Sequence, residues 1–179
     1  MSEVTRASRS SPQDLTDWCL KALRGSNDVL PMRNVDLSKL TVVVPSKCRQ
    51  DYLLRQIRYW SATSAQLIIV DGTSLPIPSE VRHQVNTHPR IEYHHIPFSL
   101  RDRLHFAGGI IETPYAVMLG DDEFHLPTGL AASIRVLEGN PELAGCMGQV
   151  LSITPMGDRQ IGVFARAYPS LYGYNVRNS

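Results

Sequence analysis

Two adjacent carboxylates, Asp121 and Asp122, stand directly after an apolar stretch that ends at Leu119. Carboxylate oxygens suit Mg²⁺ and Mn²⁺, which keep several waters and are usually completed by substrate phosphates. A solvated turn is the simpler interpretation of the pair, since acidic residues often follow strands. Asp122 and Asp121 are therefore candidate metal ligands, and Glu123 and His125, just downstream, are further candidates.

Polar segments also follow two other apolar runs. Pro45-Ser46-Lys47-Cys48-Arg49 follows the first, and Asp71-Gly72-Thr73-Ser74 follows the second. Neither contains GxxxxGK[ST] or GxGxxG, so a glycine loop that cradles phosphate is not expected. If the three runs are parallel strands, their polar ends meet at one edge of a sheet, where ligands bind in α/β folds. That placement favours a metal site over a simple turn at the acidic pair.

The elements that must position these residues are readable from hydrophobic patterning. The runs Leu40–Val44 and Leu67–Val70 are continuous and rich in β-branched residues, which is typical of strands buried on both faces. Further strands are predicted at residues 91–96, 115–119, 144–153 and 160–165, and helices at 51–62, 99–112 and 127–138, with a weaker helical pattern at 78–87. The alternation predicts an α/β fold, a three-layer α/β/α Rossmann-like arrangement with a mostly parallel central sheet.

Composition limits the class of protein. The 179 residues suffice for one core, and a net charge of +1 argues against a nucleic-acid partner. The three cysteines lack metal-site spacing, which favours a reduced, cytoplasmic setting. No apolar run approaches the ~20 residues that a transmembrane helix needs, and no signal core is visible, although composition is compatible with peripheral membrane contact.

The chain divides into three expected parts. Residues 1–10 are polar and rich in Ser and Arg, and we expect a disordered tail there. Residues 11–39 read as an N-terminal helix and a linker, with Ser11 as the cap and Pro12 in the first turn. Residues 40–179 form the α/β domain.

The stretch from Leu40 to about Ile153 resembles the donor-binding half of GT-A fold glycosyltransferases, especially the inverting family 2 group. The similarity rests on the order of a Pro-Ser-x-x-Arg-like loop, an Asp-Gly turn, a helix with Arg101 and Arg103, and a DxD-type motif at residues 120–123. Many relatives have Asp where this chain has Gly120, which leaves open whether Asp121 or Asp122 is the metal ligand.

The resemblance implies a nucleoside-diphosphate-sugar donor and a Mg²⁺ or Mn²⁺ cofactor. It also implies a donor site in which Pro45 and Ser46 lie beside the nucleobase and Arg49 lies in the same loop. Asp71 would contact the base or ribose, and Arg101 or Arg103 would lie near the base or diphosphate. Asp121 would contact the ribose and Asp122 the metal, with Glu123 acting through water. The acceptor, whether saccharide, lipid or protein, is not implied.

A catalytic base is harder to place. In this family the base is an Asp or Glu of a later segment, which deprotonates the acceptor hydroxyl. Only Glu138, Glu142 and Asp158 follow Glu123, and Asp158, in a predicted hairpin turn at 156–159, is the candidate base. The acceptor part of the domain is accordingly expected to be incomplete.

We therefore expect a metal-assisted glycosyltransferase, and two alternatives remain. A nucleotidyltransferase of related fold needs a glycine-rich basic loop after the first strand, and residues 45–49 have the charge but no glycine. A non-catalytic domain that binds a nucleotide-sugar, or a scaffold, is favoured by the missing base.

Overall fold

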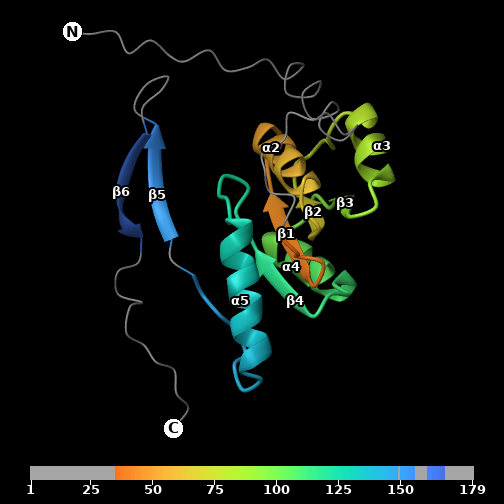
Figure 1. Cartoon of the computed structure of the whole chain (residues 1–179). Coiled ribbons are helices and arrows are strands. Elements are labelled where there is room, and N and C mark those ends of the chain that lie inside the picture. Colours follow the sequence, from red (N-terminus) through yellow and green to blue (C-terminus); the bar gives the residue numbers. More distant parts are fainter. Residues whose placement is uncertain (1–34, 149, 156–160, 168–179) are drawn as a thin grey trace, which may run out of the picture.

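The computed structural model describes residues 35–148, 150–155 and 161–167, and strands and helices alternate along the chain (Figure 1). The elements are β1 (Leu40–Ser46), α2 (Gln50–Ser61), β2 (Gln66–Asp71), α3 (Ser79–Thr87), β3 (Ile91–His95), α4 (Leu100–Ile110), β4 (Tyr115–Met118), α5 (Pro127–Gly139), β5 (Val150–Pro155) and β6 (Ile161–Ala167). The predicted tail and the predicted N-terminal helix fall on residues outside these ranges.

Four strands form one parallel sheet in the order β3-β2-β1-β4, so the chain has the α/β fold that its sequence predicts. At the centre, Val43 of β1 aligns with Ile68 of β2 and Met118 of β4. All four strands run in the same direction, so their carboxyl ends lie at the same edge of the sheet. β5 and β6 pair antiparallel in a separate two-stranded sheet, in agreement with the predicted hairpin.

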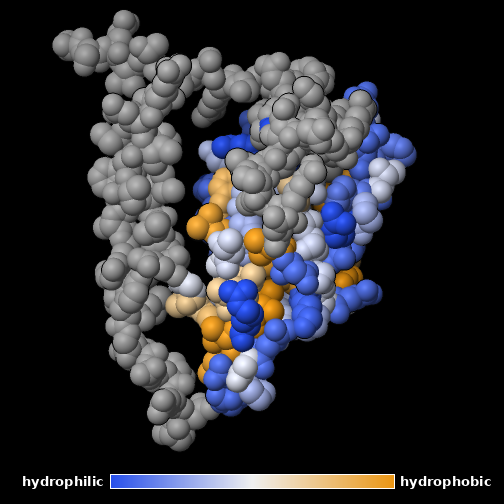
Figure 2. Space-filling model, viewed as in Figure 1, coloured by the Kyte–Doolittle hydropathy of each residue, from blue (hydrophilic) through white to orange (hydrophobic). Residues whose placement is uncertain are grey.

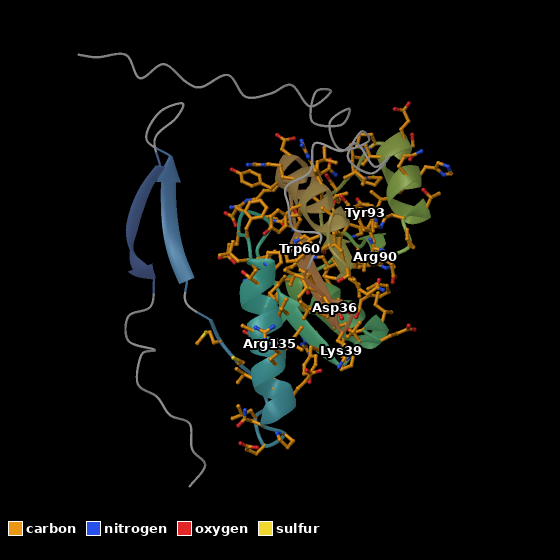
Figure 3. The ribbon with its side chains drawn as sticks, in the orientation of Figure 1. Asp36, Lys39, Trp60, Arg90, Tyr93 and Arg135 are labelled. Carbon is orange, nitrogen blue, oxygen red and sulfur yellow. The ribbon has the colours of Figure 1, made fainter. Side chains whose placement is uncertain are left out.

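The two faces of the parallel sheet hold separate apolar clusters, because successive side chains of a strand point to opposite faces. Val42 and Val44 pack in the larger cluster with residues of α2, α3 and α5. Val43 packs in the smaller cluster with Ala107 of α4. Trp60 of α2, labelled in Figure 3, is the largest of the fully buried side chains.

Several element boundaries differ from the predictions. β1 extends through Pro45 and Ser46, which align with the last two residues of β2. The strand predicted at 144–153 begins only at Val150. Leu100, the first residue of α4, is 50% exposed, whereas Arg103 and Ala107 are the buried residues of this helix.

β4 lies at the edge of the sheet, and the apolar run that forms it is only partly covered. Ala116 and Met118 are exposed, whereas Tyr115 and Val117 are half-buried. Figure 2 shows apolar surface gathered toward the left of the coloured part of the molecule. No helix among the described residues is long and apolar enough to cross a membrane.

We predict that His88, the residue that follows the last residue of α3, makes the stability of the fold sensitive to acid. Its Nδ1 accepts a hydrogen bond from the backbone N–H of Arg90 at 3.3 Å, and burial, followed by the charge of Arg90, lowers the pKa of His88. The unfolded chain therefore binds the proton more tightly, and stability falls as the pH drops through the ordinary histidine value of about 6.5.

The test compares urea unfolding of wild type and His88→Asn at about pH 7.5 and about pH 5.5, on either side of the ordinary histidine pKa. The acid-induced loss of unfolding free energy should be smaller in the variant. An equal loss in both proteins would show that other groups cause it.

Candidate functional site

The loops that follow β1, β2 and β4 meet at the carboxyl edge of the sheet, as the sequence predicts. The backbone N–H of Gly72 donates to the carbonyl oxygen of Ser46 at 2.8 Å, which joins the first two loops. The hydroxyl of Ser46 donates to Oδ2 of Asp121 at 2.8 Å, which joins the first loop to the third. Ser46, the last residue of β1, therefore contacts both the loop after β2 and the loop after β4.

The two aspartates of the acidic pair face a common point, which Arg49 occupies. Nη1 of Arg49 donates to Oδ1 of Asp121 and to Oδ2 of Asp122, each at 2.9 Å. Asp121 is buried, whereas the side chains of Asp122 and Arg49 are half exposed. The hydrogen bond and charge of Asp121, followed by those of Asp122, raise the pKa of Arg49.

The backbone of the acidic turn accepts hydrogen bonds from Gln56, a fully buried residue of α2. Its Nε2 donates to the carbonyl oxygens of Asp121 at 3.1 Å and Glu123 at 2.6 Å, and its Oε1 accepts from Nε1 of Trp60 at 3.0 Å. Sequence reasoning missed this residue. The available signal is its position, because Gln56 shares the buried face of α2 with Leu53 and Trp60.

Asp71 is fully buried, and both oxygens of its carboxylate accept hydrogen bonds. Oδ1 accepts from the backbone N–H of Thr73 at 2.8 Å and from its hydroxyl at 2.5 Å. Oδ2 accepts from the hydroxyl of Tyr93 at 2.8 Å and from Nε2 of Gln50 at 3.2 Å. Since a carboxylate has about four lone-pair sites, Asp71 holds the loop after β2, and direct contact with a ligand requires the loss or sharing of one of these bonds.

The structure separates the two arginines that the sequence left equivalent. Arg101 is exposed on the first turn of α4, whereas Arg103 is 5% exposed beneath the strand ends. Nη1 of Arg103 donates to the carbonyl oxygens of Ser46 at 2.6 Å and Val70 at 3.2 Å. A Cβ on Gly72 would lie 2.8 Å from Cζ and Nε of Arg103, so the guanidinium occupies the space that glycine leaves.

The other predicted site residues form no hydrogen bond with the two carboxylates of the acidic pair in the described part of the chain. Pro45 is half-buried within β1, and the carboxylate of Glu123 folds back to accept from the N–H of Gly120 at 3.3 Å. His125 is held through its carbonyl oxygen, which accepts from the hydroxyl of Tyr59 at 2.9 Å, and its buried Nε2 has no hydrogen-bond partner in the described part of the chain. Asp158 lies outside the described residues.

The loop that presents Arg49 has an unusual conformation. Cys48 has a φ of 58°, the left-handed region that favours glycine, and its backbone N–H donates to the hydroxyl of Thr73 at 2.8 Å. This bond ties the loop after β1 to the loop after β2, immediately before Arg49. The Cys48 side chain itself is exposed and forms no disulfide.

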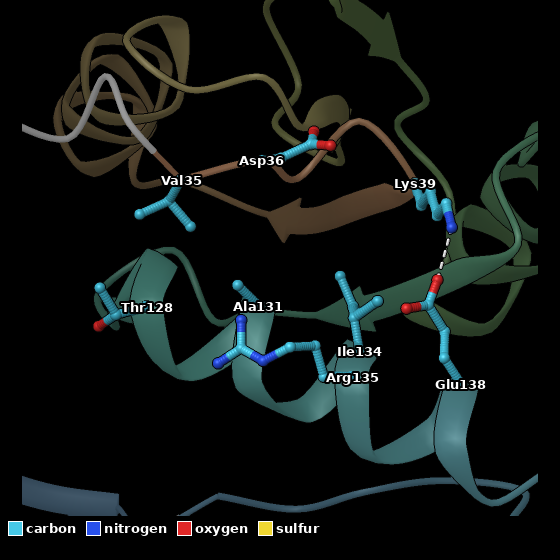
Figure 4. Close-up of a pocket in the computed structure, with 8 residues that line it drawn as sticks. All are labelled: Val35, Asp36, Lys39, Thr128, Ala131, Ile134, Arg135 and Glu138. Atoms are coloured by element: carbon cyan, nitrogen blue, oxygen red, sulfur yellow. Dashed lines mark hydrogen bonds and ion pairs between the residues drawn. The ribbon is translucent and has the colours of Figure 1, made fainter.

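A hollow of about 360 Å³ lies between α5 and the segment that enters β1 (Figure 4). Its lining consists of Val35, Asp36, Lys39, Thr128, Ala131, Ile134, Arg135 and Glu138. Nζ of Lys39 pairs with Oε1 of Glu138 at 2.5 Å, and the hydrogen bond and charge of Glu138 raise the pKa of Lys39. This hollow adjoins the amino-terminal end of β1, so it is separate from the loops described above.

Comparison with known proteins gives no answer. The sequence matches no family model, and neither the curated proteins nor the solved structures give a match. The assignment of a function therefore depends on the residues at the carboxyl edge and on their geometry.

We predict that Gln56→Leu destabilises the fold by about 2 to 4 kcal/mol, since it leaves two carbonyl oxygens and one indole N–H without their partner in a buried place. Urea denaturation followed by circular dichroism measures the change.

Gln50→Leu is the matched control. Its amide also donates two hydrogen bonds, to Asp71 and to the carbonyl oxygen of Leu75, but Gln50 is only half-buried, so water can replace it. We expect a loss below about 1 kcal/mol there. Equal losses in the two variants would contradict the role given to Gln56.

Proposed function

We propose that this chain binds a nucleoside-diphosphate-sugar at the carboxyl edge of its parallel sheet, as the donor-binding part of a glycosyltransferase with the three-layer GT-A type of fold. One observation carries the proposal. A single nitrogen of Arg49 contacts both Asp121 and Asp122, so two carboxylates converge at the edge where α/β sheets bind ligands.

The chemistry of this pair fits a divalent cation of the Mg²⁺ or Mn²⁺ kind. Such cations commonly take one or two protein carboxylates and complete their shell with water and substrate phosphate. In the part of the chain that the structure describes, no group of three or more His, Cys, Asp or Glu side chains is arranged for a metal. Metal binding is therefore expected to depend on the diphosphate of the nucleotide, and a bound cation supplies charge neutralisation for the departing diphosphate.

The surrounding residues prepare the edge for an anionic ligand. Ser46 holds one oxygen of Asp121 and leaves the other directed at the common point. Arg103 places a buried positive charge behind the ends of β1 and β2, which favours the approach of phosphate. Asp71 fixes the loop that borders the base or ribose in this proposal, and the half-buried Pro45 lies beside it in β1.

The transfer step in this proposal forms a bond between the acceptor hydroxyl oxygen and the anomeric carbon of the sugar. The bond from that carbon to the diphosphate oxygen breaks, and the nucleoside diphosphate leaves with the electron pair. The hydroxyl proton passes to a base, for which Asp158 remains the candidate outside the described residues. Inversion at the anomeric carbon is expected from the resemblance, and the acceptor class is not assigned.

The test is thermal unfolding of the full chain with UDP-, GDP- and dTDP-sugars, each with and without Mn²⁺. At least one sugar nucleotide should raise the Tm by a few degrees only when Mn²⁺ is present. This shift corresponds to an increase of about 1 to 3 kcal/mol in the free energy of unfolding. Asp122→Asn should abolish this shift because it removes one of the two converging carboxylates.

Glu142→Gln, which removes an exposed carboxylate after α5, is the matched control and should keep the shift. If no nucleotide stabilises the wild type in a metal-dependent way, the assignment of a donor site to this edge is wrong. Stabilisation without any release of the sugar to water or to an acceptor would favour a binding domain over a transferase.

A further inference from the structure

We propose that Arg49 is an internal cation that a metal must displace, and that this displacement couples metal binding to nucleotide binding. The inference rests on the proposed function, since it concerns the regulation of the same site.

The position of Arg49 follows from the charges around it. Two carboxylates directed at one point repel each other unless a cation lies between them. Nη1 of Arg49 lies at that point, 2.9 Å from an oxygen of Asp121 and 2.9 Å from an oxygen of Asp122. Arg49 thus offsets one of the two negative charges when no ligand is bound, and the three groups together keep a net charge of about −1.

A divalent metal competes for the same oxygens. Oδ2 of Asp121 already accepts from Ser46, and Arg49 contacts Oδ1, the oxygen that faces Asp122 across the shared nitrogen. A Mg²⁺ ion lies about 2.1 Å from its ligand oxygens, so it takes the place of Nη1 and cannot share it. A metal that binds between the two aspartates therefore breaks both contacts of Arg49, and without a nucleotide the released guanidinium has only water as its partner.

The side chain of Arg49 is 50% exposed, so water solvates the guanidinium after its release. The pair with Asp122, whose side chain is 49% exposed, contributes little to stability, and the metal replaces Arg49 as the partner of Asp121, whose side chain is only 7% exposed. Arg49 immediately precedes α2, so the released side chain remains beside the pair, and its planar fork matches phosphate oxygens. A diphosphate that ligates the metal gives Arg49 a new partner, so each ligand strengthens the other.

The experiment measures Mn²⁺ affinity of the full chain by electron paramagnetic resonance, first with Mn²⁺ alone and then with saturating UDP, GDP or dTDP. In Arg49→Met, Mn²⁺ alone should bind about 3- to 10-fold tighter than in wild type, because the competitor is gone. The gain in Mn²⁺ affinity that a nucleotide confers should shrink by at least the same factor.

Arg55→Met is the matched control. Arg55 is an exposed residue of α2 that lies over the ring of Tyr52, 4.0 Å from its centroid, so its loss removes a nearby positive charge without touching the pair. Its Mn²⁺ affinity should stay within about 2-fold of wild type. Arg49→Gln provides a second removal of the charge, and circular dichroism confirms that each variant is folded.

The displacement is overturned if both Arg49 variants bind Mn²⁺ alone no more tightly than wild type does. It is also overturned if Arg55→Met gains as much Mn²⁺ affinity as Arg49→Met. If no nucleotide raises Mn²⁺ affinity in any of the proteins, the coupling and the proposed function fail. Tighter binding of Mn²⁺ alone in Arg49→Met still establishes the competition in that case, so the two failures are distinguishable.

Discussion

The buried amide of Gln56 is the interaction on which the acidic turn depends. One end of the amide accepts from the indole of Trp60 in the larger apolar cluster, and the other donates to the carbonyl oxygens of Asp121 and Glu123. Backbone groups of a turn need partners when they are buried, and here a helix side chain provides them. The position of the two carboxylates is thereby tied to the packing of α2 on the sheet.

A chain of hydrogen bonds through Ser46 connects two buried charged side chains at the strand ends. Arg103 donates to the carbonyl oxygen of Ser46, and the hydroxyl of the same residue donates to Asp121. A buried cation on one side of β1 is thus linked to a buried anion on the other side. Burial of a charge without hydrogen bonds is costly, and Ser46 provides a hydrogen-bond partner to each of the two buried side chains.

The α/β fold was readable from the sequence to a large extent. The runs Leu40–Val44 and Leu67–Val70 are strands of a parallel sheet; Ser46 at the end of β1 contacts both the loop after β2 and the loop that holds the acidic pair. The partners within the site were not readable. Asp71, a candidate for ligand contact, accepts hydrogen bonds from Tyr93, Gln50 and Thr73, and no sequence pattern indicated these partners.

By itself the sequence determined the local order of elements, because apolar periodicity and turn residues act over a few neighbouring positions. It also determined which chemical groups stand at the strand ends. Only the tertiary structure decided that Arg49 lies between the two aspartates, that Arg103 is buried while Arg101 is exposed, and that β4 is an edge strand. These outcomes depend on contacts between residues far apart in the chain, such as the 72 positions that separate Arg49 from Asp121.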